Sequence, residues 1–194
     1  MTSEGNGFSP GVPGAMTIEE ALAILPAPTK ALKPLAPSYL DPEEWRPAGA
    51  RVPPGWSHLR ADALARDAGC VYCGHLPPAG SRAPLEVHHI RGHRVNDLAA
   101  LESVCVLCHR VLHAGRSAAV YGSLALFRQA VVDQNTIIRL SWHLRLTRRI
   151  DDRALMTLLD LAEPAPFRMD RPYLATLRGY VPARYWLLER GGAG

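Results

Sequence analysis

Two pairs of closely spaced cysteines constrain this chain more than any other feature. Each pair has the spacing Cys-x-x-Cys, at Cys70/Cys73 and at Cys105/Cys108, and together they account for all 4 cysteines of the sequence. The two thiolates of such a pair can reach one ion, and four sulfurs complete a tetrahedron around zinc. The spacing therefore predicts a structural zinc site that clamps together two distant segments of the chain.

The cysteines also bear on the cellular compartment. Disulfides are rare in reducing compartments, where paired cysteines more often bind a metal. Residues 1–10 contain neither a basic leader nor an apolar stretch, and no run approaches the roughly 18 consecutive apolar residues that a membrane span needs. We therefore expect a cytoplasmic protein with no membrane partner. The net charge of +4 permits an anionic partner but is too small to demonstrate one.

The composition, with 47% hydrophobic and 21% charged residues, is that of a globular chain. A chain of 194 residues suits one small domain with appendages. Thr17 followed by Glu20 is a capping-box pattern that predicts a short helix, and the many prolines after Pro26 predict an extended arm. The expected organisation is a disordered tail (1–15), a short helix and proline-rich arm (16–55), a core (56–115) and a helical C-terminal region (116–194).

Within the core, the hydrophobic pattern predicts a particular order of elements. Apolar residues recur at helical spacing from Trp56 to Arg66, which predicts a helix leading into the first cysteine pair. Residues 85–90 have strand propensity, and a second apolar run precedes Cys105. A further helix is expected to begin near Cys108. The sequence therefore predicts an α+β fold in which two strands precede this helix.

Several histidines lie between and just after the two cysteine pairs. His88 and His89 are adjacent in the first predicted strand, within Leu-Glu-Val-His-His-Ile. His109 and His113 are four residues apart on the predicted helix, so their imidazoles share one helix face. Three or four imidazoles can therefore converge in the folded chain.

In this order, the motifs resemble those of the HNH nuclease family. The resemblance covers about residues 56–115 and rests on four blocks: Cys70-x-x-Cys73-Gly74, His88-His89-Ile90, Asn96-Asp97-Leu98 and Cys105-x-x-Cys108-His109. It implies a small ββα-metal (HNH) nuclease core with a structural zinc clamp. It also implies a metal-dependent DNA endonuclease that hydrolyses phosphodiester bonds.

The resemblance assigns a role to each histidine of the core. His89 resembles the general base of the family, with Asn96 as a second catalytic residue. His88, His109 and His113 resemble the set that holds a catalytic divalent cation, which is Mg²⁺, Mn²⁺, Ni²⁺ or Zn²⁺. The chemistry agrees, because phosphodiester hydrolysis needs a base for water and a cation for the charge on the leaving oxygen.

One position departs from the family pattern and keeps two other interpretations open. The middle asparagine of the family falls on Ala100, so either another residue braces the active-site loop or activity is weak. The alternative function is a catalytically silent HNH zinc module that binds DNA or a protein. A third interpretation is the nuclease subunit of a bacterial defence or mobile-element system, whose arm (26–55) and C-terminal region dock a protein partner that supplies targeting.

Arginines outnumber acidic residues after Gly115, where the pattern of 118–146 predicts one long helix. A basic helix face can follow a phosphate backbone, although such faces are more often simply solvated. Trp142 and Trp186 are interpreted as core anchors. The candidate nucleic-acid contacts are His93, Arg139, Arg145, Arg148 and Arg149.

Overall fold

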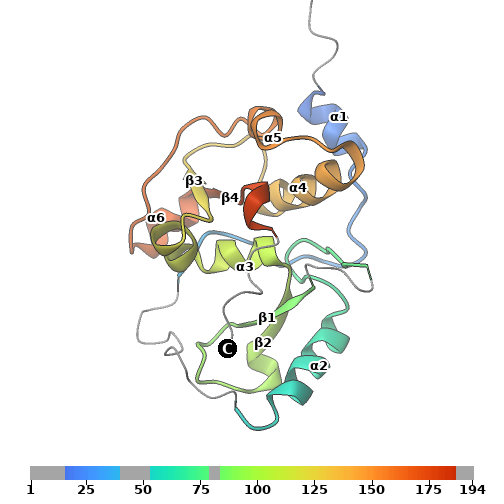
Figure 1. Cartoon of the computed structure of the whole chain (residues 1–194), viewed down its shortest axis with the longest axis vertical. Coiled ribbons are helices and arrows are strands. Elements are labelled where there is room, and N and C mark those ends of the chain that lie inside the picture. The colour runs from blue at the N-terminus through green and yellow to red at the C-terminus, as the bar shows by residue number, and fades with distance from the viewer. Residues whose placement is uncertain (1–15, 40–52, 79–83, 187–194) are drawn as a thin grey trace, which may run out of the picture.

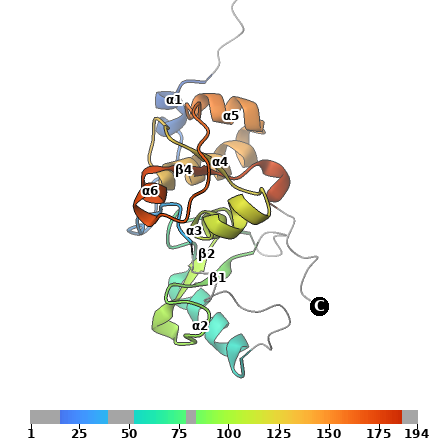
Figure 2. The same ribbon diagram turned by 90° about the vertical axis from the view of Figure 1, so that its left-hand side faces the viewer.

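The computed structural model describes residues 16–39, 53–78 and 84–186. Two halves lie on either side of helix α3 (Val106–Leu112), which crosses the middle of the molecule (Figures 1 and 2). The fold is a mixed α+β structure with two small antiparallel sheets among the described residues. The predicted tail (1–15) and part of the predicted arm (40–52) lie outside the described residues.

The lower half of Figure 1 contains the predicted strand–strand–helix order. Strand β1 (Glu86–His89) pairs antiparallel with β2 (Leu101–Val104), and the short 3-10 helix η2 (Leu98–Ala100) leads into β2. Helix α3 follows β2 directly. Cys105 is its N-cap residue, and the Cys105 sulfur accepts a hydrogen bond from the Cys108 backbone at 3.5 Å. The second cysteine pair therefore lies at the junction of strand and helix.

Helix α2 (Trp56–Asp67), close to the predicted 56–66, is fixed to this hairpin by its C-terminal half. The Asp67 carboxylate accepts a hydrogen bond from the Ser103 backbone at 2.7 Å, and the Ser103 hydroxyl donates to the Ala63 carbonyl at 3.0 Å. Arg66 donates to the Leu98 carbonyl at the start of η2 and to the Leu101 carbonyl at the start of β2. These bonds fix where the N-terminal end of α2 lies relative to β1.

The C-terminal half corrects the prediction of one long helix over 118–146. A π-helix, η3 (Gly115–Val120), and a strand, β3 (Ala125–Phe127), precede helix α4 (Gln134–Arg148). Gly122 has a φ of +59°, a left-handed conformation that favours glycine and ends the helical run. The Asp133 side chain then caps α4.

Strand β3 pairs antiparallel with β4 (Arg178–Tyr180), far along the chain. The predicted helical C-terminal region thus also contains a small sheet, because distant residues supply the partner of β3. The other elements of this half are the helices α5 (Asp152–Leu158) and α6 (Arg171–Thr176) and the 3-10 helix η4 (Ala183–Tyr185).

The described part of the N-terminal arm packs against the rest of its own chain. Helix α1 (Ile18–Ala23) begins with the predicted capping box between Thr17 and Glu20. After it, the Lys33 backbone donates to the Val71 carbonyl at 2.9 Å, and its ammonium pairs with the Glu102 carboxylate. Leu35 is buried in the core. Residues 26–39 are thus part of the folded body.

Helix α4 joins the two predicted regions, 56–115 and 116–194, through a shared core. Its residues Ile138 and Trp142 pack in the cluster that contains the four cysteines. Residues Ile137 and Leu140 pack in a second cluster with α1 and α5. No helix in the described parts of the chain is long and apolar enough to cross a membrane.

Candidate metal centres and active site

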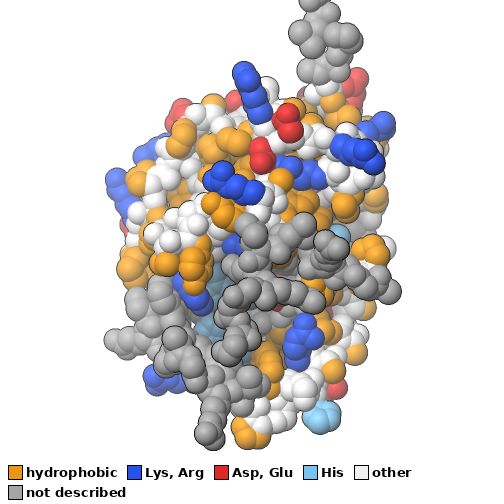
Figure 3. All heavy atoms as spheres, in the orientation of Figure 1, with side chains coloured by type: hydrophobic (Ala, Val, Ile, Leu, Met, Phe, Trp, Pro, Cys, Tyr) orange, Lys and Arg blue, Asp and Glu red, His pale blue; other side chains and the backbone are white. Residues whose placement is uncertain are grey.

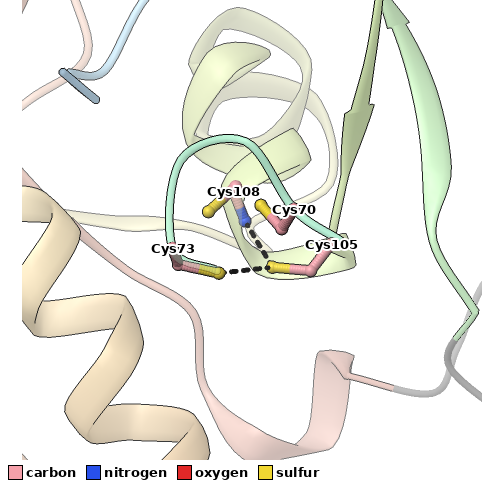
Figure 4. Close-up of side chains that lie close together, drawn as sticks. All are labelled: Cys70, Cys73, Cys105 and Cys108. Atoms are coloured by element: carbon pink, nitrogen blue, oxygen red, sulfur yellow. Dashed lines mark hydrogen bonds between the residues drawn. The ribbon is translucent and has the colours of Figure 1, made fainter. Parts of the chain in front are cut away.

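The four cysteines form a buried cluster with the dimensions of a zinc site (Figure 4). Their sulfurs all lie within 4.8 Å of one another, and those of Cys73 and Cys105 are 3.6 Å apart. Zinc–sulfur bonds of about 2.3 Å place the sulfurs of a tetrahedron about 3.8 Å apart. The cluster is therefore compatible with structural zinc, as the spacing predicted.

Local backbone geometry presents the first cysteine pair to the second. The Gly74 backbone donates to the Cys70 carbonyl at 2.9 Å and closes a tight turn around the pair. Gly74 has a φ of +74°, and a Cβ at this position would meet Leu32 of the N-terminal arm at 3.6 Å. Glycine therefore permits the left-handed turn, whereas a side chain at this position would make only an ordinary contact with the arm.

The sulfurs are buried, and their surroundings shift the thiol pKa values in opposite directions. The hydrogen bond with the Cys105 thiol is the main cause that lowers the pKa of Cys70, whereas burial raises the pKa of Cys108. The Trp142 indole donates to the Cys105 sulfur at 3.3 Å and stacks on His75 with ring centroids 4.0 Å apart. A buried N–H aimed at sulfur favours the thiolate, the form that binds metal.

A second group of possible ligands lies where β1 faces α3. It consists of His88 from the strand and His109 and His113 from the helix, and their nearest ring nitrogens all lie within 4.8 Å of one another. The His88 Nδ1 and His113 Nε2 atoms are 3.1 Å apart. The helical spacing brings His109 and His113 to one face, as predicted, and strand alternation directs His88 toward them. This set can hold a metal ion.

Glu86 orients one ring of this set. Its carboxylate and the His109 Nδ1 are 2.5 Å apart, so Nδ1 carries the hydrogen, and in the neutral imidazole Nε2 then carries the lone pair. The His109 Nε2 is buried and has no hydrogen-bond partner among the described residues. A carboxylate behind a histidine whose other nitrogen is buried and unpaired is the arrangement of metal-ligating histidines.

The charge states in this group also favour metal binding. Burial, with the neighbouring His109, lowers the pKa of His88 to about 3 and that of His113 to about 2. Burial raises the pKa of Glu86, but the hydrogen bond from His109 and the nearby arginines outweigh it and hold this pKa below its usual value. At neutral pH, His88 and His113 are therefore neutral rings with lone pairs for a cation, beside an ionised carboxylate.

His89, the predicted base, has different neighbours from His88. Its Nε2 is 3.2 Å from the Asn96 side-chain oxygen, and its ring stacks on Trp56 with centroids 5.0 Å apart and an interplanar angle of 11°. Because an amide oxygen only accepts, Nε2 carries the hydrogen, and in the neutral imidazole Nδ1 then carries the lone pair. His93 connects the two groups, with ring centroids 5.0 Å from His89 and 6.0 Å from His113.

The contact of Asn96 with His89 is relevant to Ala100, the position where the family pattern has an asparagine. Ala100 is fully buried at the end of η2, and its carbonyl accepts a hydrogen bond from the Ile90 backbone at 3.0 Å. This bond closes the loop between β1 and η2, and the loop carries Asn96 to the imidazole. The side-chain amide that contacts His89 therefore comes from Asn96. The backbone carbonyl of Ala100 holds the loop that carries Asn96.

The candidate nucleic-acid contacts on α4 lie in two different kinds of surroundings. Arg145 is 11% exposed, pairs with Asp152, and lies over the Trp186 ring with its guanidinium carbon 4.9 Å from the centroid. Arg139 donates to the Pro26 carbonyl. Both arginines are therefore occupied by contacts with their own chain, whereas Arg148 and Arg149 are exposed, in the half of the molecule away from β1 (Figure 1).

The face shown in Figure 3 carries scattered Lys and Arg side chains and acidic groups mainly at its upper end. Two other exposed arginines, Arg91 and Arg94, flank His93 in the loop after β1. They lie much nearer to the histidines along the chain than the arginines of α4 do.

Sequence reasoning missed Glu86 and Trp56 as parts of this site. Glu86 had a signal, because it precedes His88 by two positions in a strand and the two side chains share a face. Trp56 had none, because its contact with His89 depends on how α2 docks on the hairpin.

Comparison with protein-family models, with curated proteins and with solved structures finds no match for this chain. The arrangement of the side chains therefore has to support any functional proposal by itself.

Proposed function

We propose that this protein is a metal-dependent DNA endonuclease of the ββα-metal type. The observation that carries the proposal is the pair of neighbouring histidine groups on one strand and helix. One group, His88, His109 and His113, offers three ring nitrogens within 4.8 Å of one another, with the buried Nε2 of His109 unpartnered. Beside it, His89 is held with its lone pair on Nδ1.

In the proposed reaction, the two histidine groups have different roles. The His89 Nδ1 takes a proton from water, whose oxygen forms a bond to phosphorus while the bond to the leaving oxygen breaks. The leaving oxygen is then protonated from solvent. A divalent cation bound by the three imidazoles would supply positive charge close to the scissile phosphate. Glu86 holds His109 in the tautomer that ligates, and Asn96 holds His89 in the tautomer that accepts a proton.

The direct test is cleavage of supercoiled plasmid by the purified protein with Mg²⁺, Mn²⁺, Ni²⁺ or Zn²⁺, and with EDTA. We expect nicked or linear product with at least one ion and none with EDTA. Because EDTA can also remove zinc from the cysteines, the melting curve of the chelated protein and restoration by added Mg²⁺ are the controls. Intact plasmid with every ion, despite DNA binding, would support the silent zinc module instead.

The surface proposed to contact DNA is the loop of residues 90–97, which follows β1. A turn closed by the Val95 backbone and the Gly92 carbonyl at 3.2 Å shapes this loop, and His93 within it contacts His89 and His113. Arg91 and Arg94 flank His93 and are exposed. Guanidinium groups this close along the chain to the proposed base are suited to phosphate oxygens on either side of the scissile bond.

Neutralising this loop is expected to weaken DNA binding more than neutralising α4. The paired variants are R91Q/R94Q and, as a matched control at exposed positions, R148Q/R149Q. For the loop variant we expect the slope of log affinity against log salt to fall by about two, roughly one for each phosphate that is no longer neutralised. Fluorescence anisotropy with a labelled duplex at several salt concentrations measures both slopes. A larger change in the α4 variant would assign DNA binding to the C-terminal half.

A protein partner that supplies targeting, in a defence or mobile-element system, remains part of the proposal only through the resemblance to the family. The described part of the proline-rich arm packs on this chain, with Leu35 in the core.

A further inference from the structure

The indole of Trp56 covers one face of the His89 imidazole. The two rings are nearly parallel, with an interplanar angle of 11° and centroids 5.0 Å apart. Trp56 is half-buried and His89 is 7% exposed. A stacked aromatic ring restricts rotation of the imidazole about its side-chain bonds, which the contact with Asn96 at one edge of the ring cannot do alone.

The position of Trp56 is set by the helix that carries it. Trp56 is the first residue of α2, and Gly55 before it, in the left-handed region with a φ of +75°, starts the helix. The other end of α2 is bonded to β2 through Asp67 and Ser103, and its middle is bonded to the start of β1 by Arg60, which donates to the Leu85 carbonyl at 3.0 Å. The helix is thus attached to both strands of the hairpin.

We propose that Trp56 is a positioning residue for His89, an inference that rests on the nuclease function proposed above. Helix α2 holds the indole against the imidazole, Asn96 holds the Nε2 edge, and together they direct Nδ1 toward the attacking water. Trp56 takes no part in proton transfer and binds no metal. Its contribution is to orientation, and misplacing a catalytic group by about 1 Å can cost roughly 100-fold in rate.

The test compares W56A and W56F with wild-type protein in steady-state cleavage of a DNA duplex. We expect W56A to lower kcat by about 10- to 100-fold with KM nearly unchanged, because orientation affects the reacting state rather than binding. W56F keeps a ring against His89 and is expected to restore most of kcat. Zinc content and melting curves of both variants show whether they fold.

A second readout does not depend on catalysis. In ¹H–¹⁵N spectra of the histidine rings, the His89 ring protons in the wild-type protein are expected to show an upfield shift from the indole. This shift should disappear in W56A and be smaller in W56F. In the wild-type protein, the His89 Nε2 should carry the proton.

The possible outcomes separate this inference from the proposed function. If wild-type protein cuts DNA and W56A cuts with the same kcat, Trp56 does not position the base, although the nuclease stands. A raised KM with unchanged kcat would make Trp56 a DNA contact instead. Equal loss of kcat in W56A and W56F, with lowered melting temperatures, would make it only structural. Wild-type protein that never cuts DNA would refute the nuclease, and the positioning role with it.

Discussion

Replacing His89 with alanine is expected to reduce DNA cleavage by about 100- to 10,000-fold, the usual contribution of a general base. The affinity for DNA should change little, because a base acts mainly in the transition state and contributes little to the ground-state complex. Zinc content and melting should also persist, since the cysteine cluster is a separate group of ligands. Single-turnover cleavage of a labelled duplex measures the rate, and anisotropy measures the affinity.

The matched control is His58→Ala, which removes an exposed imidazole from α2 in the same half of the molecule. It should cut DNA at close to the wild-type rate. If His89→Ala instead cut at the wild-type rate, the base would have to be sought elsewhere, first at His93, whose ring centroid lies 5.0 Å from that of His89.

Replacing Cys105 with serine is expected to abolish zinc binding and cooperative unfolding together. Serine is a good N-cap and can keep the hydrogen bond that Cys105 accepts at the start of α3, so the variant removes mainly the metal ligand. Structural zinc contributes about 10–16 kcal/mol in small zinc domains, whereas whole domains are stable by only about 5–15 kcal/mol. Metal analysis should find about one zinc per wild-type chain and none in the variant.

Trp142→Phe is the companion variant for this experiment. It removes the indole N–H that donates to the Cys105 sulfur but leaves all four ligands in place. We expect zinc to be retained, with a smaller loss of stability of about 1 kcal/mol, as for a single hydrogen bond.

A soluble Cys105→Ser protein that melts cooperatively at the wild-type temperature would show that the cluster does not need a metal to fold.

The parts of the fold that the sequence predicted correctly depend on short spacings. The two residues between paired cysteines bring two sulfurs together whatever the rest of the chain does, and the interval between His109 and His113 does the same on a helix. The Thr17–Glu20 capping box is likewise local. The order of two strands followed by a helix was predicted from patterns within residues 85–113.

The parts that could not be predicted depend on distant partners. Strand β3 exists because β4, some fifty residues later, pairs with it, so the apolar pattern of 118–146 indicated the wrong element. The sequence suggested that Arg145 faces solvent, whereas in the structure its guanidinium contacts Asp152 and Tyr180. The contact between Asn96 and His89 depends on how the loop closes at Ala100, which no periodicity encodes.

The shared core around α4 limits how the strand–strand–helix region can be used outside its own chain. Ile138 and Trp142 of α4 and Leu174 and Trp186 further along pack in the same cluster as the cysteines. A fragment ending near residue 115 would lose these neighbours and expose the apolar side of the cysteine cluster to water. The strand–strand–helix unit is therefore not expected to fold when it is separated from the C-terminal half. Gene fusions and truncations have to include both halves.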